Sequence, residues 1–194
     1  MVTVHDTLHV PSPWVAAYLA PASPNSSPNP AALDVACGPG RHLRLAHRLG
    51  YRVTGIDRDV SGVADLAQID GIALLSADLE NGDPWPLPGV TFQAVIVTNY
   101  LHRPRLPDIV AAVSPDGVLI YETFAVGNER LGRPTNPDFL LRPGELLAAT
   151  HGVLTPIAFQ HATLCEPKRV VQRIIAVGRG HAWLADPPAH AGEF

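Results

Sequence analysis

The chain has 194 residues, of which 46% are hydrophobic, and a formal net charge of −4 at pH 7. This length is enough to bury one sizeable core, and the apolar fraction is ordinary for a globular protein. The slight acidic excess argues against a nucleic-acid partner, and no apolar run approaches the roughly 18 residues of a membrane span. The first residues lack the charged and apolar regions of a secretory signal peptide, so we expect a cytoplasmic protein. The two cysteines, Cys37 and Cys165, are too far apart for a metal-binding pattern or a disulfide framework.

Residues 1–30 are expected to form a short helix near 14–19 and then a proline-rich linker. The linker from Pro21 to Pro30 reads PASPNSSPNP, which cannot form a regular helix or a central strand. The main domain is therefore predicted over 31–180. The tail from 181 to 194 shows no clear pattern.

Strand and helix patterns alternate along the main domain. Strands are predicted at 32–36, 52–57, 72–77, 94–98 and 118–124, and helices at 41–49, 60–67, 106–113 and 143–151. A proline-rich connection, DPWPLPG, takes the place of a helix before the fourth strand. The last two strands, 155–165 and 169–178, are joined by three residues, which is too short for a crossover, so they must be antiparallel. The alternation predicts an α/β fold with a parallel sheet covered by helices on both faces.

The segment from Ala31 to Asp57, ALDVACGPGRHLRLAHRLGYRVTGID, predicts a ligand site. Its first apolar run ends in Asp34 and a glycine-bearing turn, where Gly38 and Gly40 let the backbone approach a ligand closely. The following helix points free N–H groups at the same place. Asp57 lies 19 residues after Gly38 (57 − 38), about the spacing expected of an acid that binds ribose hydroxyls.

Two nucleotide-binding motifs are excluded. The dinucleotide fingerprint requires a glycine where this chain has Leu43, and the phosphate-binding P-loop pattern is missing. The turn D-V-A-C-G-P-G instead resembles motif I of the class I S-adenosylmethionine-dependent methyltransferases. Over residues 31–178 this resemblance implies a Rossmann-like fold, with a mostly parallel seven-stranded sheet that ends in an antiparallel strand. It also implies S-adenosyl-L-methionine as the cofactor, and no metal.

The resemblance implies that cofactor-binding residues follow four successive strands. Asp34 would orient the amino group of the cofactor, or alternatively cap the turn, and Asp57 would bind the ribose. The residues implied at these four places are Asp34, Ala36, Cys37, Gly38, Gly40, Arg41 and His42, then Asp57 and Arg58, then Ala77, Asp78 and Leu79 at the adenine, then Asn99, Tyr100 and Leu101 beside the methionine part. Three of these residues have an alternative role that does not involve the cofactor: Cys37 as a buried packing residue, His42 as a residue that faces solvent, and Asp78 as a cap of its turn.

The acceptor is expected beside the long polar segment from Tyr121 to Leu146, which follows the fifth strand. This segment resembles small bacterial methyltransferases related to the tellurite-resistance methyltransferases, in which it would border the acceptor site. Its arginines would then hold an anionic acceptor; a solvated surface loop is the alternative. The implied substrate-binding residues are Tyr100, Glu122, Arg130, Asn136 and Arg142. Glu122 and His102 are the candidate bases, needed only for a hydroxyl or amine acceptor.

The function predicted is methyl transfer to a small molecule such as a thiol, a metalloid oxyanion or another metabolite. Two alternatives remain: a nucleic-acid or protein methyltransferase, and a non-catalytic module that only binds S-adenosylmethionine. The N-P-P-Y or D-P-P-Y sequence of amine-directed nucleic-acid methyltransferases is replaced here by Asn99-Tyr100-Leu101-His102. The sequence indicates neither the acceptor atom nor the oligomeric state.

Overall fold

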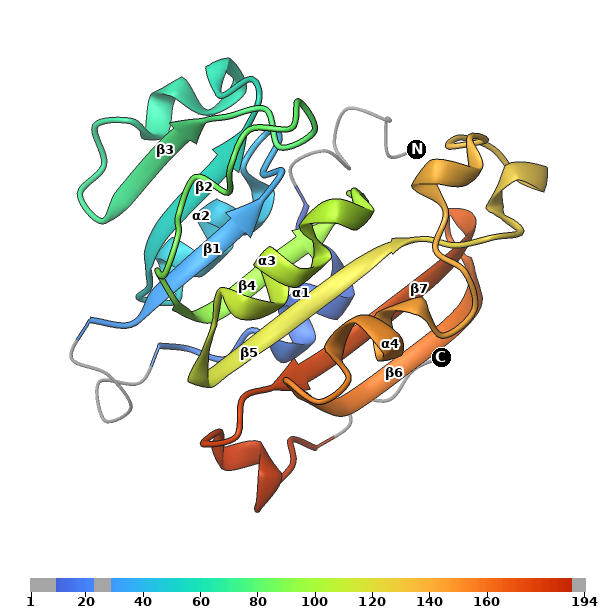
Figure 1. The fold of residues 1–194 in the computed structure, drawn as a ribbon. Helices are drawn as coiled ribbons and strands as arrows, with labels where there is room; N and C mark the ends of the chain where they lie inside the picture. Colours follow the sequence, from blue (N-terminus) through green and yellow to red (C-terminus); the bar gives the residue numbers. More distant parts are fainter. Residues whose placement is uncertain (1–9, 23–28, 190–194) are drawn as a thin grey trace.

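The computed structural model describes residues 10–22 and 29–189 and contains a seven-stranded sheet with the order β3-β2-β1-β4-β5-β7-β6 (Figure 1). The strands are β1 (Ala31–Val35), β2 (Arg52–Asp57), β3 (Ile72–Ser76), β4 (Phe92–Thr98), β5 (Val113–Phe124), β6 (Thr155–Cys165) and β7 (Lys168–Val177). The first five strands are parallel to one another, whereas β7 runs antiparallel to both β5 and β6. The predicted mostly parallel sheet with a terminal antiparallel strand is confirmed.

Helices cover both faces of this sheet. They are α1 (Pro13–Tyr18), α2 (Arg41–Arg48), α3 (Leu106–Ala111) and α4 (Glu145–Thr150). In Figure 1, α3 and α4 lie in front of the sheet, and α1 and α2 lie behind it. Side chains alternate between the faces of a strand, so Leu119 packs into the core under α3 and α4 while Ile120 packs into the core under α1 and α2.

The helix predicted over 60–67 is wrong. The structure has a 3₁₀ segment, Ser61–Leu66, with a kink at Val63, and only Val63 and Leu66 are buried there. Two buried residues three apart suit the three-residue turn of a 3₁₀ helix, so a longer amphipathic helix is not required. Asp59 still orders the entry to this segment, because its carboxylate accepts a hydrogen bond from the Ser61 N–H at 2.9 Å.

Two other boundaries differ from the prediction. Val113, expected at the end of a helical stripe, begins β5, and the turn that follows it falls where the β4–β5 register shifts. Pro143, expected in the first helical turn, precedes α4, which begins after Gly144 in the left-handed conformation (φ 76°). The α1, α2 and hairpin predictions agree with the structure to within one or two residues.

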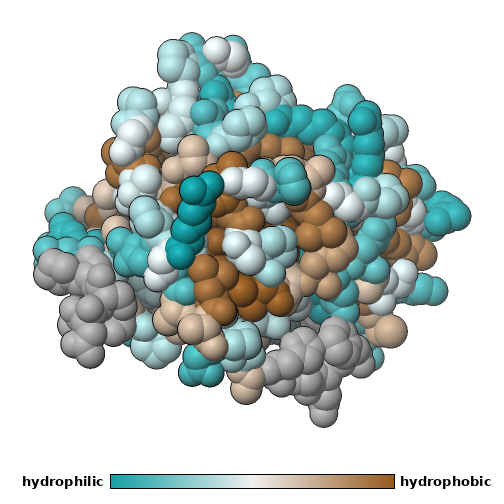
Figure 2. Space-filling view, turned by 60° about the horizontal axis from the view of Figure 1, so that its bottom comes forward, coloured by the Kyte–Doolittle hydropathy of each residue, from teal (hydrophilic) through white to brown (hydrophobic). Residues whose placement is uncertain are grey.

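The amino-terminal helix α1 is part of the core. Trp14, Val15 and Tyr18 are buried against β-strand residues of the rear face. Near the other end of the chain, Trp183 contacts Tyr18 edge-on, with ring centroids 6.4 Å apart. Figure 2 brings the bottom of the Figure 1 view forward and shows apolar residues gathered near the middle of that face, with polar residues around them. Part of the predicted linker, 23–28, lies outside the described residues, and none of the described helices could cross a membrane.

Candidate active site

A cavity of about 410 Å³ opens at the carboxyl ends of β1, β2, β3 and β4. In doubly wound sheets this is the edge at which ligands bind. The cavity is lined by Ala36, Asp57, Arg58, Ala77, Asp78, Leu79, Glu80, Asn99, Tyr100 and Phe139. The structure therefore brings together eight of the predicted cofactor residues and adds two that the sequence did not predict, Glu80 and Phe139.

The two glycines of the turn do different things. Gly38 has a φ of +50°, and a Cβ added there would meet no atom within 4 Å, so its backbone borders open space. Gly40 has a φ of +75°, and a Cβ there would lie 2.6 Å from Cγ1 of Val63. Gly40 is thus needed for close packing. It was predicted to bind the cofactor, but it does not line the cavity.

Asp57 is held at the cavity wall by the backbone. Its Oδ2 accepts a hydrogen bond from the Gly38 N–H at 2.8 Å, and its Oδ1 accepts one from the Asp59 N–H at 3.1 Å. These bonds fix the carboxylate between the turn after β1 and the end of β2. A carboxylate oxygen has two acceptor positions, so Asp57 can still accept bonds from a ligand's hydroxyl groups.

Asp34, at the carboxyl end of β1, has an unusual environment. Its side chain is 1% exposed, and Oδ2 has no hydrogen-bond partner among the described residues. Burial raises the pKa of this carboxyl to about 7, with a smaller contribution from Asp57, while the Leu43 backbone and Arg41 act in the other direction. A buried carboxylate oxygen without a partner fits the amino group of S-adenosylmethionine, so the residues present suit this cofactor.

The first residues of α2 hold the amino-terminal segment and do not line the cavity. His42 is 1% exposed, so it does not face solvent. Its Nε2 accepts a hydrogen bond from the Ser12 N–H at 3.0 Å, and its protonated Nδ1 therefore donates to Thr98 Oγ1 at 3.3 Å. Burial, followed by the charge of Arg41, lowers the pKa of His42 to about 3. Arg41 donates to Thr98 Oγ1 and to the Val10 carbonyl.

Cys37 is a packing residue, which is the alternative role predicted for it from the sequence. It is 5% exposed, and burial together with the charges of Asp34 and Asp57 raises the pKa of its thiol to about 12. The thiol stays protonated and is not a nucleophile.

A second cavity, of about 250 Å³, adjoins the first on the side of β5. The two share Glu80, Asn99, Tyr100 and Phe139, and the second is completed by Leu101, Thr123, Phe124 and Pro134. The Tyr100 hydroxyl is buried without a hydrogen-bond partner among the described residues. Burial, and next the charge of Glu80, raises the pKa of this hydroxyl, so it remains a donor.

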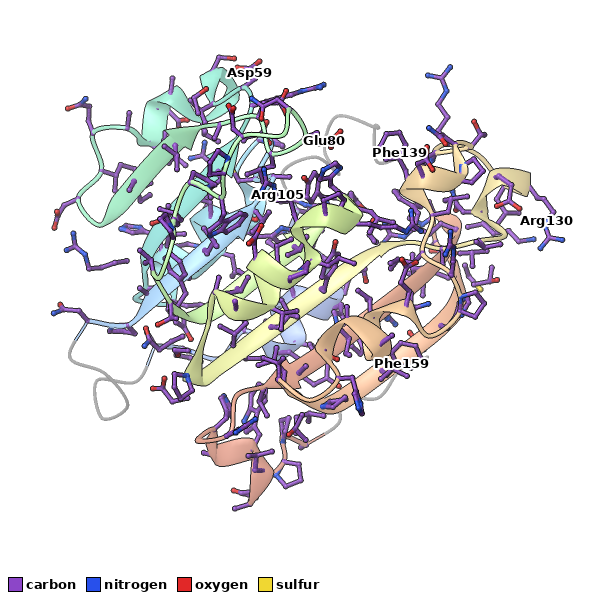
Figure 3. All side chains as sticks on the ribbon, viewed as in Figure 1. Asp59, Glu80, Arg105, Arg130, Phe139 and Phe159 are labelled. Carbon is purple, nitrogen blue, oxygen red and sulfur yellow. The ribbon has the colours of Figure 1, made fainter. Side chains whose placement is uncertain are left out.

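The charged residues predicted for the acceptor are elsewhere. Arg130, Asn136 and Arg142 are exposed, and none of them lines either cavity. Figure 3 shows Arg130 pointing away from the body of the molecule, whereas Phe139 lies on the side of the loop nearer Glu80. The residues of this loop that line the cavities are therefore Pro134 and Phe139, whereas its arginine side chains are exposed to solvent.

Neither predicted base lines a cavity. Glu122 is 2% exposed, and its carboxylate accepts bonds from Arg169 at 3.1 Å, Arg173 at 3.2 Å and the Ser12 hydroxyl at 3.1 Å. This carboxylate is paired with two arginines and lies outside both cavities, so its place in the structure is that of an ion-pair partner. His102 is half-buried at the start of a 3₁₀ turn and lines neither cavity.

Arg105 supports the site from outside and was not predicted. Its guanidinium donates to the Leu79 carbonyl at 2.9 Å, to the Asp83 carbonyl and to Asp108 at 3.2 Å. It thereby braces the connection between β3 and β4, which has no helix of its own. No local pattern distinguishes this arginine in the sequence. Glu80, by contrast, lies two residues after Asp78, and Phe139 lies in the loop predicted to be functional.

Comparison with known proteins agrees with this geometry. Residues 32–115 match the family model described as "Methyltransferase domain", and no curated protein matches the chain. A methyltransferase of Methanosarcina mazei aligns with a TM-score of 0.62 and 16% identity, over 87% of this chain and 98% of its own. One of Mesorhizobium loti aligns with a TM-score of 0.59 and 19% identity, over 76% and 90%.

TehB of Haemophilus influenzae aligns with a TM-score of 0.59 and 18% identity. This match covers 80% of our chain but 59% of TehB, so the chain spans little more than half of that protein's length. Identities this low establish the fold alone, and the matched methyltransferase domain covers less than half of the chain. By its matched domain and its fold, the chain is similar to class I S-adenosylmethionine-dependent methyltransferases, whose cofactor is S-adenosyl-L-methionine.

Proposed function

We propose that the enzyme methylates a small-molecule acceptor, which is held in the smaller cavity beside the cofactor. The observation that supports this most is the pair of adjoining cavities, about 410 and 250 Å³, that share Asn99 and Tyr100 as a common wall. Their sizes suit a cofactor and a compact ligand. The acidic residues around the larger cavity disfavour a nucleic-acid acceptor, because its phosphates would be repelled.

The cofactor would be held by residues from four strand ends. In this proposal Asp34 accepts from the amino group, Asp57 accepts from the ribose hydroxyls, and the segment from Ala77 to Leu79 borders the adenine. The open side of Gly38 leaves room for the methionine part. When bound, S-adenosylmethionine supplies a methyl group on a sulfonium, which passes in line to a lone pair of the acceptor as the carbon–sulfur pair returns to sulfur.

The protein's share of the chemistry is positioning and the exclusion of water. Asn99 and Tyr100 stand where the two ligands would meet, and Phe139 covers both cavities from the loop. No carboxylate or imidazole predicted as a base lines this meeting point among the described residues. Neither predicted base is therefore assigned that role. An acceptor that arrives as an ammonium would pass its proton to Glu80, the carboxylate that lines both cavities, before its lone pair receives the methyl group.

The test is a calorimetric titration of the protein with S-adenosylhomocysteine, run beside Asp57→Ala. We expect micromolar binding to the wild type and binding weaker by about 1–3 kcal/mol in the variant, because hydrogen bonds to a carboxylate are lost. Asp65→Ala removes an exposed carboxylate that pairs with Arg44 and lines neither cavity, and it serves as the matched control. NADH should bind poorly to the wild type.

Three results would contradict the proposal. They are no binding of S-adenosylhomocysteine to the wild type, an unchanged dissociation constant in Asp57→Ala, or comparable affinity for NADH. Each is read from the same titration.

A further inference from the structure

We propose that the acceptor carries no negative charge and has an apolar, ring-sized part, and that Glu80 selects against anions. This inference rests on the proposed function and deepens it by naming the substrate class. It departs from the anionic acceptor that the loop arginines predicted. The strongest support is the charge of the residues that line the two cavities.

The lining of the site is acidic. Around the larger cavity, three carboxylates, Asp57, Asp78 and Glu80, face a single cation, Arg58. Among the described residues, Glu80 is the only charged one that lines the smaller cavity. In the proposed function Asp57 and Asp78 lie beside the cofactor, so Glu80 is the remaining carboxylate that can contact the acceptor. A carboxylate there repels an anion and attracts an amine or another hydrogen-bond donor.

Arg58 lines the larger cavity only, and the two arginines that follow β4, Arg103 and Arg105, already have other partners. Arg103 donates to Glu145 at 2.7 Å and to the carbonyls of Asp138 and Leu140 at 2.8 and 2.9 Å. Arg105 is bound to the β3–β4 connection. Neither has a guanidinium free to neutralise an anionic acceptor, and Arg130 points away from the site (Figure 3).

The second cavity is otherwise apolar and aromatic. Leu101, Phe124, Pro134 and Phe139 make up half of its lining, and the ring of Phe139 is 42% exposed although it is a large hydrophobic group. An exposed aromatic ring at the mouth of a cavity suits stacking against a flat apolar ligand. The unpartnered Tyr100 hydroxyl adds one hydrogen bond at the wall shared with the cofactor. A carboxylate, aromatic rings and one hydroxyl together form a site for an aromatic amine or a neutral analogue.

The test uses two probes of similar size and opposite charge, 2-phenylethylamine and 3-phenylpropionate, with sodium selenite as an oxyanion. Each is titrated into wild-type protein saturated with S-adenosylhomocysteine. We expect the amine to bind at least about tenfold more tightly than the carboxylate, and selenite not to bind. Glu80→Gln should reduce the preference to about threefold or less, and Phe139→Ala should weaken both aromatic probes. Glu166→Gln, an exposed acid at the β6–β7 turn, is the matched control and should change nothing.

Several outcomes would overturn the inference. Equal or tighter binding of 3-phenylpropionate or selenite would do so, and so would a preference that survives Glu80→Gln. Failure of both aromatic probes to bind protein that still binds S-adenosylhomocysteine would also refute it, while leaving the proposed function standing. If S-adenosylhomocysteine itself does not bind, both proposals fall together.

Discussion

At the scale of single residues, Asp34 should make cofactor binding depend on pH. The pKa of its carboxyl is raised from 3.8 to about 7 in the folded protein, chiefly by burial. Below about pH 7 this carboxyl is therefore mostly neutral. The ammonium group of the ligand binds the ionised carboxylate more tightly than the neutral carboxyl, so binding should weaken as the pH falls. We expect S-adenosylhomocysteine to bind about tenfold more tightly at pH 8 than at pH 5.5, and Asp34→Asn to remove most of this difference.

The ligand-free protein provides the control for Asp34. Between about pH 4 and 7 the folded state holds a proton that the unfolded state has lost, so the free energy of unfolding falls as the pH rises through this range. Asp34→Asn should flatten this dependence in urea unfolding measured at pH 5 and pH 8. If neither the affinity for S-adenosylhomocysteine nor the free energy of unfolding changed with pH, Asp34 would be ionised throughout this range.

Glu122 is the residue at which a structural role and a catalytic role can be separated. Its replacement by Gln leaves Arg169 and Arg173, which are 20% and 12% exposed at their side chains, without a counter-charge. We expect Glu122→Gln to lower the free energy of unfolding by about 3 kcal/mol, because a buried pair loses one partner. The affinity for S-adenosylhomocysteine should stay within about twofold of the wild type, which is roughly 0.4 kcal/mol. Urea unfolding and calorimetry measure the two quantities, and an unchanged stability would restore Glu122 as a candidate base.

At the scale of elements, the connection between β3 and β4 depends on Arg105. Without this guanidinium, the carbonyls of Leu79 and Asp83 lose their donor, and the residues that border the adenine lose their brace. Arg105→Ala should therefore weaken S-adenosylhomocysteine binding by about tenfold, or roughly 1.4 kcal/mol, although Arg105 does not line the cavity. Amide hydrogen exchange over 77–91 should become faster. Unchanged exchange together with unchanged affinity would contradict the bracing role.

The strands were predictable because each is an apolar run that ends in turn residues. The strand ends were predictable as a site for a related reason, since the carboxyl ends of neighbouring parallel strands meet at one edge. Asp57, Asp78 and Asn99 were found in this way. The 3₁₀ segment at Ser61–Leu66 was not, because two buried residues three apart satisfy either helix type.

The loop after β5 could not be predicted, since its course is set by contacts distant in the sequence. Asn128 is buried and accepts a hydrogen bond from the Val170 N–H, while Arg103 bonds the Leu140 carbonyl. These contacts decide which loop side chains face the cavity. Charge alone pointed to Arg130, whereas the side chain that reaches the site is that of Phe139.

At the scale of the whole molecule, the amino-terminal segment is part of the core on the rear face of the sheet. The Trp14 ring is 6% exposed, lies 4.8 Å from the Tyr18 ring and carries the Arg173 guanidinium 4.4 Å from its centroid. Trp14→Ala should lower the free energy of unfolding by about 3–5 kcal/mol, because it empties a large buried volume. Val10→Ala, at a side chain that is 59% exposed, is the matched control for urea unfolding. A loss below about 1 kcal/mol would show that α1 is dispensable for stability.

The packing of α1 also has a practical consequence for where this protein can be cut or joined. The matched methyltransferase domain begins at residue 32, but Trp14 and Val15 fill the core behind β4 and β5, and Ser12 bonds to both His42 and Glu122. A fragment expressed from the first matched residue would expose that apolar layer to water and leave both of those side chains short of a partner. Fragments meant to be soluble, and chimaeras that exchange this domain with a relative, should therefore keep the chain from before Ser12 and carry any fusion upstream of it.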